Sequence, residues 1–367
     1  MGVIAPFAEP AAGVAGPHEG VGVGWPLVSV VITCYNYARY IGACLGSIQR
    51  QNYPRFECVV VDDCSNDGSA ELVEQFIRQH GLAAQFSLVR HERNRGQLAA
   101  FRTGLQASEG PFVVFVDADD LLHENFLATH VAAHLRVSPV AFTCSNQYQV
   151  DEHAELIGGA YLELRPEQGA QRVEPRCLFR PAWIWATTSS MMFRRAALEA
   201  ILPQSGADDE FRRCADYYIC HFSNLLGGSV LLPELLAYYR RHGANCFSTN
   251  RLIGARLPPG DMRTHPTHRT VVSVIRRHVL AHWGDFAALL TERGAVSMLS
   301  RITPPGQAAA LALRALARRA GTVPLRLALR LLRQSCTRYA TFVLRSFCVA
   351  APFAQLKVEP AEHEPRR

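Results

Sequence analysis

Short apolar runs alternate with amphipathic segments over residues 28–145 of this 367-residue chain. The apolar runs are rich in β-branched and aromatic residues, which is typical of strands buried on both faces of a sheet. They occupy residues 28–33, 56–63, 86–90, 112–117 and 140–145. The segments between them carry apolar residues at helical spacing. This order predicts an α/β fold, in which a mostly parallel sheet is sandwiched by helices and joined by right-handed crossovers.

Residues 146–250 continue the pattern less regularly. Residues 151–181 show little periodicity, and we expect them to form an irregular excursion. Residues 187–201 predict a strand that leads into a helix, and residues 214–228 predict a helix with an acidic start. We therefore expect one domain over residues 27–250.

The two ends of the chain differ from this domain in composition. Residues 1–26 are rich in Gly, Ala and Pro and lack the basic start and apolar core of a signal peptide, which predicts a flexible tail. Residues 251–270 are rich in Pro, Arg and His and are interpreted as a linker. Residues 271–367 show Leu-, Ala- and Arg-rich helical patterns, which predict a basic α-helical appendage.

The net charge of +6 has its main source in this appendage, because residues 301–356 hold nine arginines and no acidic residue. Five of them would fall near one helical face: Arg314, Arg318, Arg326, Arg330 and Arg333. Such a helix can lie on an anionic membrane, or it can pack as part of an ordinary helical bundle, and the sequence leaves both open. Nucleic-acid binding is not expected, since no aromatic interleaving or known module accompanies the arginines.

Eleven cysteines are scattered along the chain without a C-x-x-C pair or a repeated spacing. We expect reduced packing residues in a cytoplasmic protein, with a peripheral contact at the inner face of the cell membrane if the arginine-rich helix binds lipid. A membrane-spanning helix is not expected, because no segment reaches about 18 uninterrupted apolar residues.

Polar side chains follow three of the predicted strands where each one ends. Thr33 and Tyr35 follow the first strand, Asp62 and Asp63 end the second, and the fourth runs into the acidic stretch "VDADD" at 116–120. Ligands bind beyond the carboxyl ends of parallel strands, so these positions are the candidate site.

The stretch "VDADD" places Asp117, Asp119 and Asp120 together at the end of a buried strand. Their mutual repulsion would raise at least one pKa unless a divalent cation, itself holding a phosphate-bearing ligand, offsets the charge. The alternative is that an Asp here caps the following helix. For Asp63 we expect a hydrogen bond to a nucleobase or a ribose hydroxyl, whereas Asp67 and Ser69 suit a turn.

The segment "VSVVITCYNYARYIGACLGSIQRQNYPRFECVVVDDCSNDGSAELV", followed by "HERNRGQLAAFRTGLQASEGPFVVFVDADD", resembles the nucleotide-sugar-binding half of the family 2 glycosyltransferases. The resemblance covers residues 28–240 and implies the GT-A fold, with a nucleotide-sugar-binding half over 27–145 and an acceptor-binding half over 146–250. The whole set of motifs, in order, is far more specific than an isolated D-x-D.

On the donor side, the resemblance implies that Thr33 and Tyr35 help to hold the base and that Asp63 binds it. Asp117 would lie near the ribose, and Asp119 would bind Mg²⁺ or Mn²⁺ that bridges the donor diphosphate. Further metal contacts are expected from three residues: Asp117, Asp120 and His242, the last in "YYRRHGANCFS". Arg95 and Arg102 suit either phosphate binding or helix solvation.

On the acceptor side, the resemblance implies that Asp216 is the catalytic base, although Ala215 stands where the family commonly has an acidic residue. Asp216 also suits the N-cap of the following helix. Asp208 and Asp209 are the rival candidates, in a loop that the resemblance places near the acceptor.

The implied reaction is direct displacement with inversion, from a nucleotide-diphosphate sugar to a hydroxyl of a glycan or lipid-linked acceptor, in the synthesis of a cell-surface polysaccharide. The alternative is a catalytically degenerate nucleotide-sugar-binding or scaffold protein, for which Ala215 is the support. A sugar-1-phosphate nucleotidyltransferase fits less well, because "TCYNYARY" is not a Gly-rich phosphate loop.

Overall fold

The computed structural model describes residues 24–289 with internal gaps, and beyond them residues 298, 301 and 302. The gaps are residues 138, 160–163, 165–166, 168, 177, 179–182, 203–207, 244 and 246–265. Contacts divide the chain into a unit of residues 1–282 and a unit of residues 283–367, and each is described by itself. Most of the predicted tail, most of the predicted linker and the arginine-rich helix lie outside the described residues.

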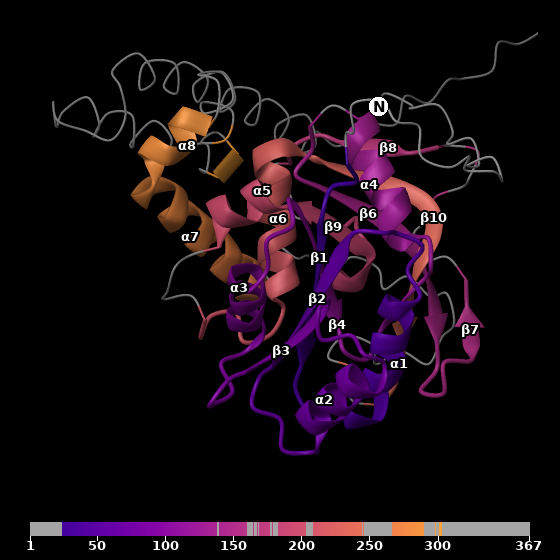
Figure 1. The fold of residues 1–367 in the computed structure, drawn as a ribbon. Coiled ribbons are helices and arrows are strands. Elements are labelled where there is room, and N and C mark those ends of the chain that lie inside the picture. Colours follow the sequence, from indigo (N-terminus) through magenta and orange to yellow (C-terminus); the bar gives the residue numbers. More distant parts are fainter. Residues whose placement is uncertain are drawn as a thin grey trace, which may run out of the picture. The chain divides into compact units, whose positions relative to one another are not determined.

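Four parallel strands form the first half of the sheet, in the order β3-β2-β1-β4 (Figure 1). They are β1 (Val28–Cys34), β2 (Phe56–Asp62), β3 (Phe86–Arg90) and β4 (Phe112–Asp117). Helices α1 (Ala38–Gln49), α2 (Ser69–Gln79) and α3 (Gln97–Gln106) connect them in turn. This half confirms the βαβ series that the apolar periodicity predicts.

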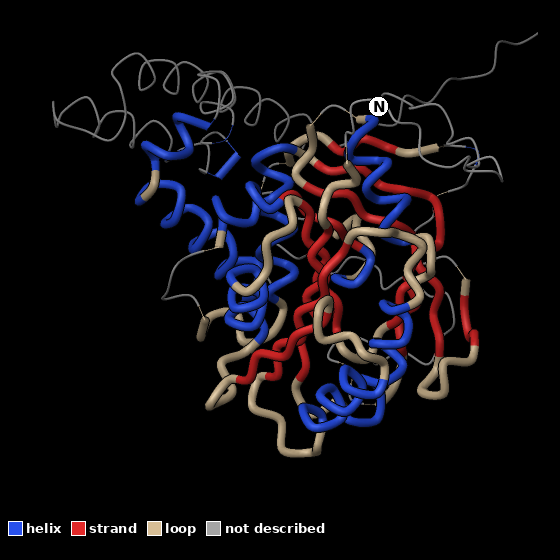
Figure 2. The backbone as a smooth tube through the Cα atoms, in the orientation of Figure 1, coloured by secondary structure: helices blue, strands red, loops and turns tan. Residues whose placement is uncertain are grey.

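Alternate residues of β1 face opposite sides of the sheet. Val30 and Ile32 join a core cluster with residues of α1 and α2, whereas Val31 lies against Gly104 of α3. Figure 2 shows the helices packed on either side of the strands. A central strand buried on both faces needs an unbroken apolar run, which explains the composition of β1 and β4.

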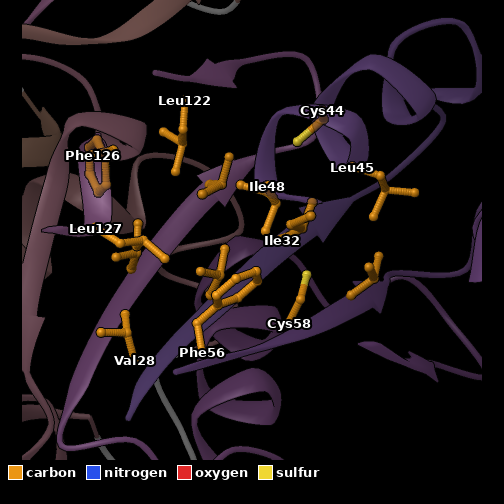
Figure 3. Packing of buried hydrophobic residues seen from close by; sticks show 14 of the residues in the cluster. Val28, Ile32, Cys44, Leu45, Ile48, Phe56, Cys58, Leu122, Phe126 and Leu127 are labelled. Atoms are coloured by element: carbon orange, nitrogen blue, oxygen red, sulfur yellow. The ribbon is translucent and has the colours of Figure 1, made fainter. Parts of the chain in front are cut away.

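One core cluster fills the space between the sheet, α1 and α4 (Phe126–Arg136). Figure 3 shows Cys44 and Ile48 of α1 close to Ile32 and Cys58 of the strands. The cysteines of the described residues are free thiols, and most of them are buried. Burial raises the pKa of the Cys34 thiol to about 12, so this group packs as a small apolar residue.

The second half of the sheet is mixed. Strand β9 (Met191–Arg194) lies antiparallel between β4 and β6 (Phe142–Val150), and β10 (Ser229–Arg240) runs parallel to β6. Three short strands pair at its margins: β5 (Leu121–Leu122), β7 (Leu156–Gly158) and β8 (Gln171–Val173). The mostly parallel sheet predicted from the sequence is confirmed, with β9 as an antiparallel strand between β4 and β6.

The sheet forks at the carboxyl end of β4. Pairing between β4 and β1 continues to Asp117, but pairing between β4 and β9 covers only Phe112 to Val114. The 3-10 turn η2 (Thr188–Ser190) lies beside the last residues of β4 instead, and it leads directly into β9 and α5 (Arg195–Ile201). The predicted strand-to-helix segment is therefore confirmed, with an additional turn at its start.

Helix α6 (Ala215–Gly227) confirms the predicted helix with an acidic start, and α7 (Pro266–Ala281) packs against it. Helix α7 begins inside the stretch predicted as a linker, where Pro266 suits a first helical position. In the second unit, α8 spans Trp283–Leu289. Among the described residues, no helix has the length and apolar character needed to cross a membrane.

Candidate active site

Asp117 ends β4 at the fork of the sheet. Its Oδ1 accepts hydrogen bonds from the Thr33 hydroxyl and from Nε2 of Gln97, each at 3.3 Å. Its backbone N–H donates a hydrogen bond to the Ser189 hydroxyl at 3.1 Å. The turn η2 thus supplies the acceptor that the backbone of a neighbouring strand would otherwise provide. Three separate segments therefore fix this one residue.

Several carboxylates converge around Asp117. Burial, together with the negative charges of Asp119 and Asp216, raises the pKa of Asp117 to about 7, even though Gln97 and Thr33 stabilise its ionised form. The structure thus brings the D-x-D stretch and the residue predicted as catalytic base into one electrostatic environment. A cation placed here would relieve repulsion that the protein itself does not neutralise.

Asp119 faces His242. Nε2 of His242 lies 2.9 Å from Oδ2 of Asp119, and both side chains are buried. The imidazole stacks on Tyr40 of α1 with ring centroids 5.0 Å apart, and the backbone carbonyl of Asp119 accepts a hydrogen bond from Nε of Arg240 at 2.7 Å. Two of the four residues predicted as metal ligands are therefore adjacent and held in place.

These two residues fit the donor set of a divalent cation. A carboxylate oxygen and an imidazole nitrogen suit Mn²⁺, and Mg²⁺ needs few protein ligands when phosphate and water complete its shell. No group of three His, Cys, Asp or Glu side chains with metal-binding geometry occurs among the described residues. The protein would accordingly supply Asp119 and His242, and a bound diphosphate and water would supply the rest.

Asp120 points away from this pair. Its two carboxylate oxygens accept hydrogen bonds from the Ser189 hydroxyl at 2.7 Å and from the backbone N–H of Arg240 at 2.9 Å. Burial and the neighbouring Asp119 and Asp117 charges raise its pKa. With both oxygens bonded inside the protein, Asp120 ties η2 and β10 to the D-x-D turn, and the metal role predicted for it has no geometric support.

Asp63 holds the loop before α3. Its carboxylate lies 2.7 Å from Nδ1 of His91 and accepts the backbone N–H groups of Arg95 at 2.8 Å and Gly96 at 2.7 Å. Burial alone would raise the pKa of Asp63, but these hydrogen bonds outweigh it and lower the pKa below its usual value. Asp63 is therefore ionised and firmly placed, with both oxygens bonded inside the protein. The base-binding role predicted for it stays a prediction.

The other predicted base contacts surround Asp63. Tyr35 is 46% exposed at the end of β1, so its ring is accessible to a ligand. Asp62, which the sequence did not single out as a ligand, is buried, and its Oδ1 has no hydrogen-bond partner among the described residues. A buried carboxylate oxygen without a donor is uncommon, and this oxygen could accept a hydrogen bond from a ligand.

Asp216 lies in the first turn of α6. Its Oδ1 accepts the backbone N–H of Tyr217 at 2.8 Å, and the Thr188 hydroxyl also bonds to its carboxylate. Burial raises the pKa of Asp216, which increases its proton affinity as a general base requires. Ala215 is completely buried, so an acidic side chain at that position would also be buried.

The rival acceptor-side candidates lie in different environments. Both oxygens of Asp208 bond to the guanidinium of Arg102 at 2.6 Å, in a bidentate pair. Asp209 is almost fully exposed and lies 3.8 Å from Arg212. The structure thus makes Asp208 an ion-pair partner. Arg102 is buried in this pair and therefore does not solvate its helix, and phosphate binding by Arg102 stays a prediction.

Three further site residues escaped the sequence analysis: Gln97, Ser189 and Tyr40. Each of them contacts residues that are distant in the sequence. Such contacts cannot be recognised from hydrophobic periodicity or from a position at the end of a strand. Only the position of Gln97, directly after a glycine at the start of a predicted helix, could have drawn attention to it.

The sequence model described as "Glycosyl transferase family 2" matches residues 29–202. The chain belongs to this family. The match contains the two donor-side acidic stretches and η2, and the sheet order with flanking helices confirms the fold class expected of a GT-A glycosyltransferase. Family 2 members are enzymes of glycosyl transfer, so the enzyme class predicted from the sequence is also confirmed.

Curated relatives agree with this assignment. An uncharacterized glycosyltransferase from Nostoc sp. is 33% identical over 224 residues, which cover 59% of this chain and 66% of the relative. Glycosyltransferase GlyG from Streptococcus pneumoniae is 32% identical over 127 residues, 34% of this chain and 40% of the relative. The chain therefore spans only part of the length of these relatives.

Among solved structures, S. aureus TarS 1-349 with UDP-GlcNAc has a TM-score of 0.48 at 19% identity, covering 86% of this chain and 91% of that one.

Proposed function

We propose that this protein is an inverting, metal-dependent glycosyltransferase that transfers a sugar from a nucleotide-diphosphate sugar to a hydroxyl of a glycan or lipid-linked acceptor. The observation that carries the proposal is the convergence of Asp117, Asp119 and Asp216 at the fork of the sheet. The residues proposed for the metal and the candidate base thus lie close enough to influence one another electrostatically.

On the donor side, we assign Tyr35 and Asp63, which follow the ends of neighbouring strands, to the base. Tyr35 is exposed, whereas Asp63 is buried and holds the loop before α3. Asp119 and His242 would hold Mg²⁺ or Mn²⁺, which would stabilise the negative charge that develops on the diphosphate leaving group. Asp117, which accepts a hydrogen bond from Thr33, is the residue that we assign to the ribose or diphosphate.

On the acceptor side, Asp216 would take the proton from the attacking hydroxyl. Its carboxylate is kept in one orientation by the Tyr217 N–H and the Thr188 hydroxyl, so it does not need to reorganise as the reaction proceeds. Attack from the face opposite the nucleotide forms the new glycosidic bond as the bond to the diphosphate breaks, and this gives inversion.

The role in cell-surface polysaccharide synthesis is supported by the names of two relatives. A putative teichuronic acid biosynthesis glycosyltransferase, TuaG from Bacillus subtilis, is 35% identical over 95 residues. The poly(ribitol-phosphate) β-N-acetylglucosaminyltransferase TarS from Staphylococcus aureus is 37% identical over 102 residues. The cytoplasmic location and the contact of the arginine-rich helix with an anionic membrane stay predictions.

The test is a donor screen with the purified protein. UDP-, GDP- and dTDP-sugars are offered with Mn²⁺ or Mg²⁺, and thermal stabilisation and nucleotide release are measured for the wild type, Asp119→Ala and Asp216→Asn. We expect one donor to stabilise the wild type only with metal, Asp119→Ala to lose this response, and Asp216→Asn to bind the donor but turn over about 10² to 10⁴-fold more slowly.

The matched control is Asp285→Asn, an exposed aspartate in the first turn of α8. It should bind and turn over as the wild type does. Nuclear magnetic resonance of the product's anomeric proton reports whether the configuration inverts. If the wild type and Asp216→Asn bind the donor equally well and neither turns it over, the protein is instead a non-catalytic sugar-nucleotide-binding protein.

A further inference from the structure

The side chain of Gln97 joins the two sides of the candidate site. Its Nε2 donates to Oδ1 of Asp117 at 3.3 Å, and its Oε1 accepts the backbone N–H of Ala215 at 2.9 Å. Ala215 is the first residue of α6, and the next residue is the candidate base Asp216. One amide group thus spans from the donor-side carboxylate to the helix end that carries the base.

The backbone around Gln97 is fixed from the donor side. Asp63 accepts the N–H groups of Arg95 and Gly96, the two residues that precede Gln97. His91, whose Nδ1 lies 2.7 Å from Asp63, also contacts the Thr103 hydroxyl of α3 at 2.9 Å through Nε2. The start of α3 is therefore held by the residue expected to bind the nucleotide base.

The same backbone is fixed from the acceptor side. The N–H groups of Gln97 and Leu98 donate to the carbonyls of Arg212 and Phe211 at 3.0 and 3.2 Å. Gly96 has φ +87°, and a Cβ built on it would lie 2.5 Å from Cα of Arg212. The two segments therefore approach as closely as a residue without a side chain allows.

The side-chain bridge meets a specific need at the start of α6. Cys214, which precedes the helix, has the left-handed φ of 61°, and its side chain makes no capping hydrogen bond. The first N–H groups of a helix have no partner within the helix, so the Ala215 N–H requires an acceptor from elsewhere. Gln97 provides it, although 118 positions separate the two residues.

We infer that Gln97 is a positioning residue that holds the N-terminus of α6, and with it Asp216, at a fixed place relative to Asp117. The inference deepens the proposed function and rests on it for its effect on rate. Displacement of a catalytic group by about 1 Å can slow an enzyme about 10²-fold, so the loss of this bridge should act on kcat. Of the residues assigned to donor binding, the Gln97 side chain contacts Asp117 but not Asp63, Asp119 or Tyr35. Asp117 also keeps its hydrogen bonds to Thr33 and Ser189, so we expect the larger effect on kcat.

The test compares Gln97→Met with the wild type. Methionine has nearly the same length and shape but neither the amide donor nor the amide acceptor, and the backbone hydrogen bonds to Arg212 and Phe211 stay. We expect kcat to fall about 10 to 10²-fold, with the KM of the donor within about twofold. The control is Gln106→Met, at the exposed end of the same helix, which should match the wild type.

A second readout does not depend on activity. Hydrogen exchange of a peptide covering residues 211–217 reports the protection of the Ala215 amide, and a peptide covering β1 serves as the internal reference. In Gln97→Met the first peptide should exchange faster, and the second should be unchanged. If the exchange rate or kcat of Gln97→Met equals that of the wild type, the inference is wrong while the proposed function stands. If no donor is turned over by the wild type but exchange responds as expected, the proposed function fails and the bridge remains established.

Discussion

Nε2 of His242 lies 2.9 Å from Oδ2 of Asp119, although the two residues are 123 positions apart in the chain. His242 follows the end of β10, and Asp119 follows the end of β4. Each half of the sheet therefore contributes one candidate metal ligand, and the two ligands lie next to each other. A cation at this point would bind to both halves at once.

His242→Ala removes one of these two donors. We expect the affinity for a nucleoside diphosphate in the presence of Mn²⁺ to fall at least about tenfold, or ~1.4 kcal/mol, with little change when metal is omitted. Isothermal calorimetry with and without Mn²⁺ measures both values. His153→Ala, an exposed histidine 3.8 Å from Glu152, is the control. Equal Mn²⁺-dependent binding by His242→Ala and the wild type would place the metal elsewhere.

The pH dependence of turnover should report Asp216. Because burial raises its pKa above the ordinary value of 3.8, the carboxylate ionises later on the pH scale than an exposed aspartate does. A general base works only when it is ionised, so kcat/KM should rise with pH through this raised pKa. Rates measured from about pH 4 to pH 8 test this. If the rise of kcat/KM with pH persists unchanged in the residual activity of Asp216→Asn, the titrating group is not Asp216.

Acid should unfold the protein through buried histidines. Burial lowers the pKa of His134 to about 4 and that of His221 to about 3, and it also lowers the pKa of His130. Below pH 6.5 the unfolded state takes up a proton that the folded state resists, so each histidine lowers the free energy of unfolding by about 1.4 kcal/mol per pH unit until its folded pKa is reached. Above pH 6.5 this contribution is absent.

Urea unfolding at about pH 4.5, 5.5 and 7.5 measures that slope. His134→Gln keeps a side-chain donor for the carbonyl of Met192, which Nε2 of His134 contacts at 3.0 Å, and it should reduce the slope by the contribution of one histidine. His80→Gln, at an exposed position, is the matched control and should leave the slope as it is. An unchanged slope in His134→Gln would mean that this ring is protonated in the folded state.

Arg102→Ala should destabilise the fold. Its side chain is 8% exposed and makes the bidentate pair with Asp208, so its removal leaves a partly buried carboxylate without its partner. We expect a loss of about 3 kcal/mol in the free energy of unfolding. Arg95→Ala, a half-exposed arginine 3.6 Å from the same carboxylate, should lose less than about 1 kcal/mol. Similar losses of stability in the two variants would contradict the conclusion that Arg102 is the main ion-pair partner of Asp208.

Gly96→Ala should disturb the site more than the fold. The new methyl group would have to displace the backbone of Arg212, and the φ of +87° disfavours alanine in addition. We expect a loss of about 1 to 3 kcal/mol of stability together with a lower kcat. Gly42→Ala in α1 is the control, because nothing lies within 4 Å of its new methyl group and helical alanine is favoured. A Gly96→Ala variant as stable and active as Gly42→Ala would contradict the close approach.

Some site residues could be predicted from the sequence because their positions follow from the succession of strands and helices along the chain. Asp117 and Asp63 were recognisable because they end apolar runs predicted as parallel strands, and Asp216 was recognisable through the resemblance to the family. The structure places Asp117 and Asp216 in one environment, as the resemblance to the family implied.

The residues that escaped prediction act through long-range contacts. Ser189 bonds to Asp120 across 69 positions, and Gln97 bonds to the Ala215 amide across 118. Nothing in the local pattern separates Asp120, bonded inside the protein, from Asp119, which faces His242. Only the tertiary fold decides which carboxylate oxygens are already hydrogen-bonded.

The fork at β4 also bears on how this chain can be dissected. The four parallel strands form a contiguous stretch of sequence, but the far edge of β4 is covered by β9, which comes 74 positions after β4 ends, from Asp117 to Met191. A fragment that stopped after β6 would expose Phe112, Val113 and Val114 as an unpaired apolar edge, a ready template for aggregation. The first half of the sheet is thus continuous in sequence but depends on β9 to cover its β4 edge, and expression trials should retain the chain at least through α6.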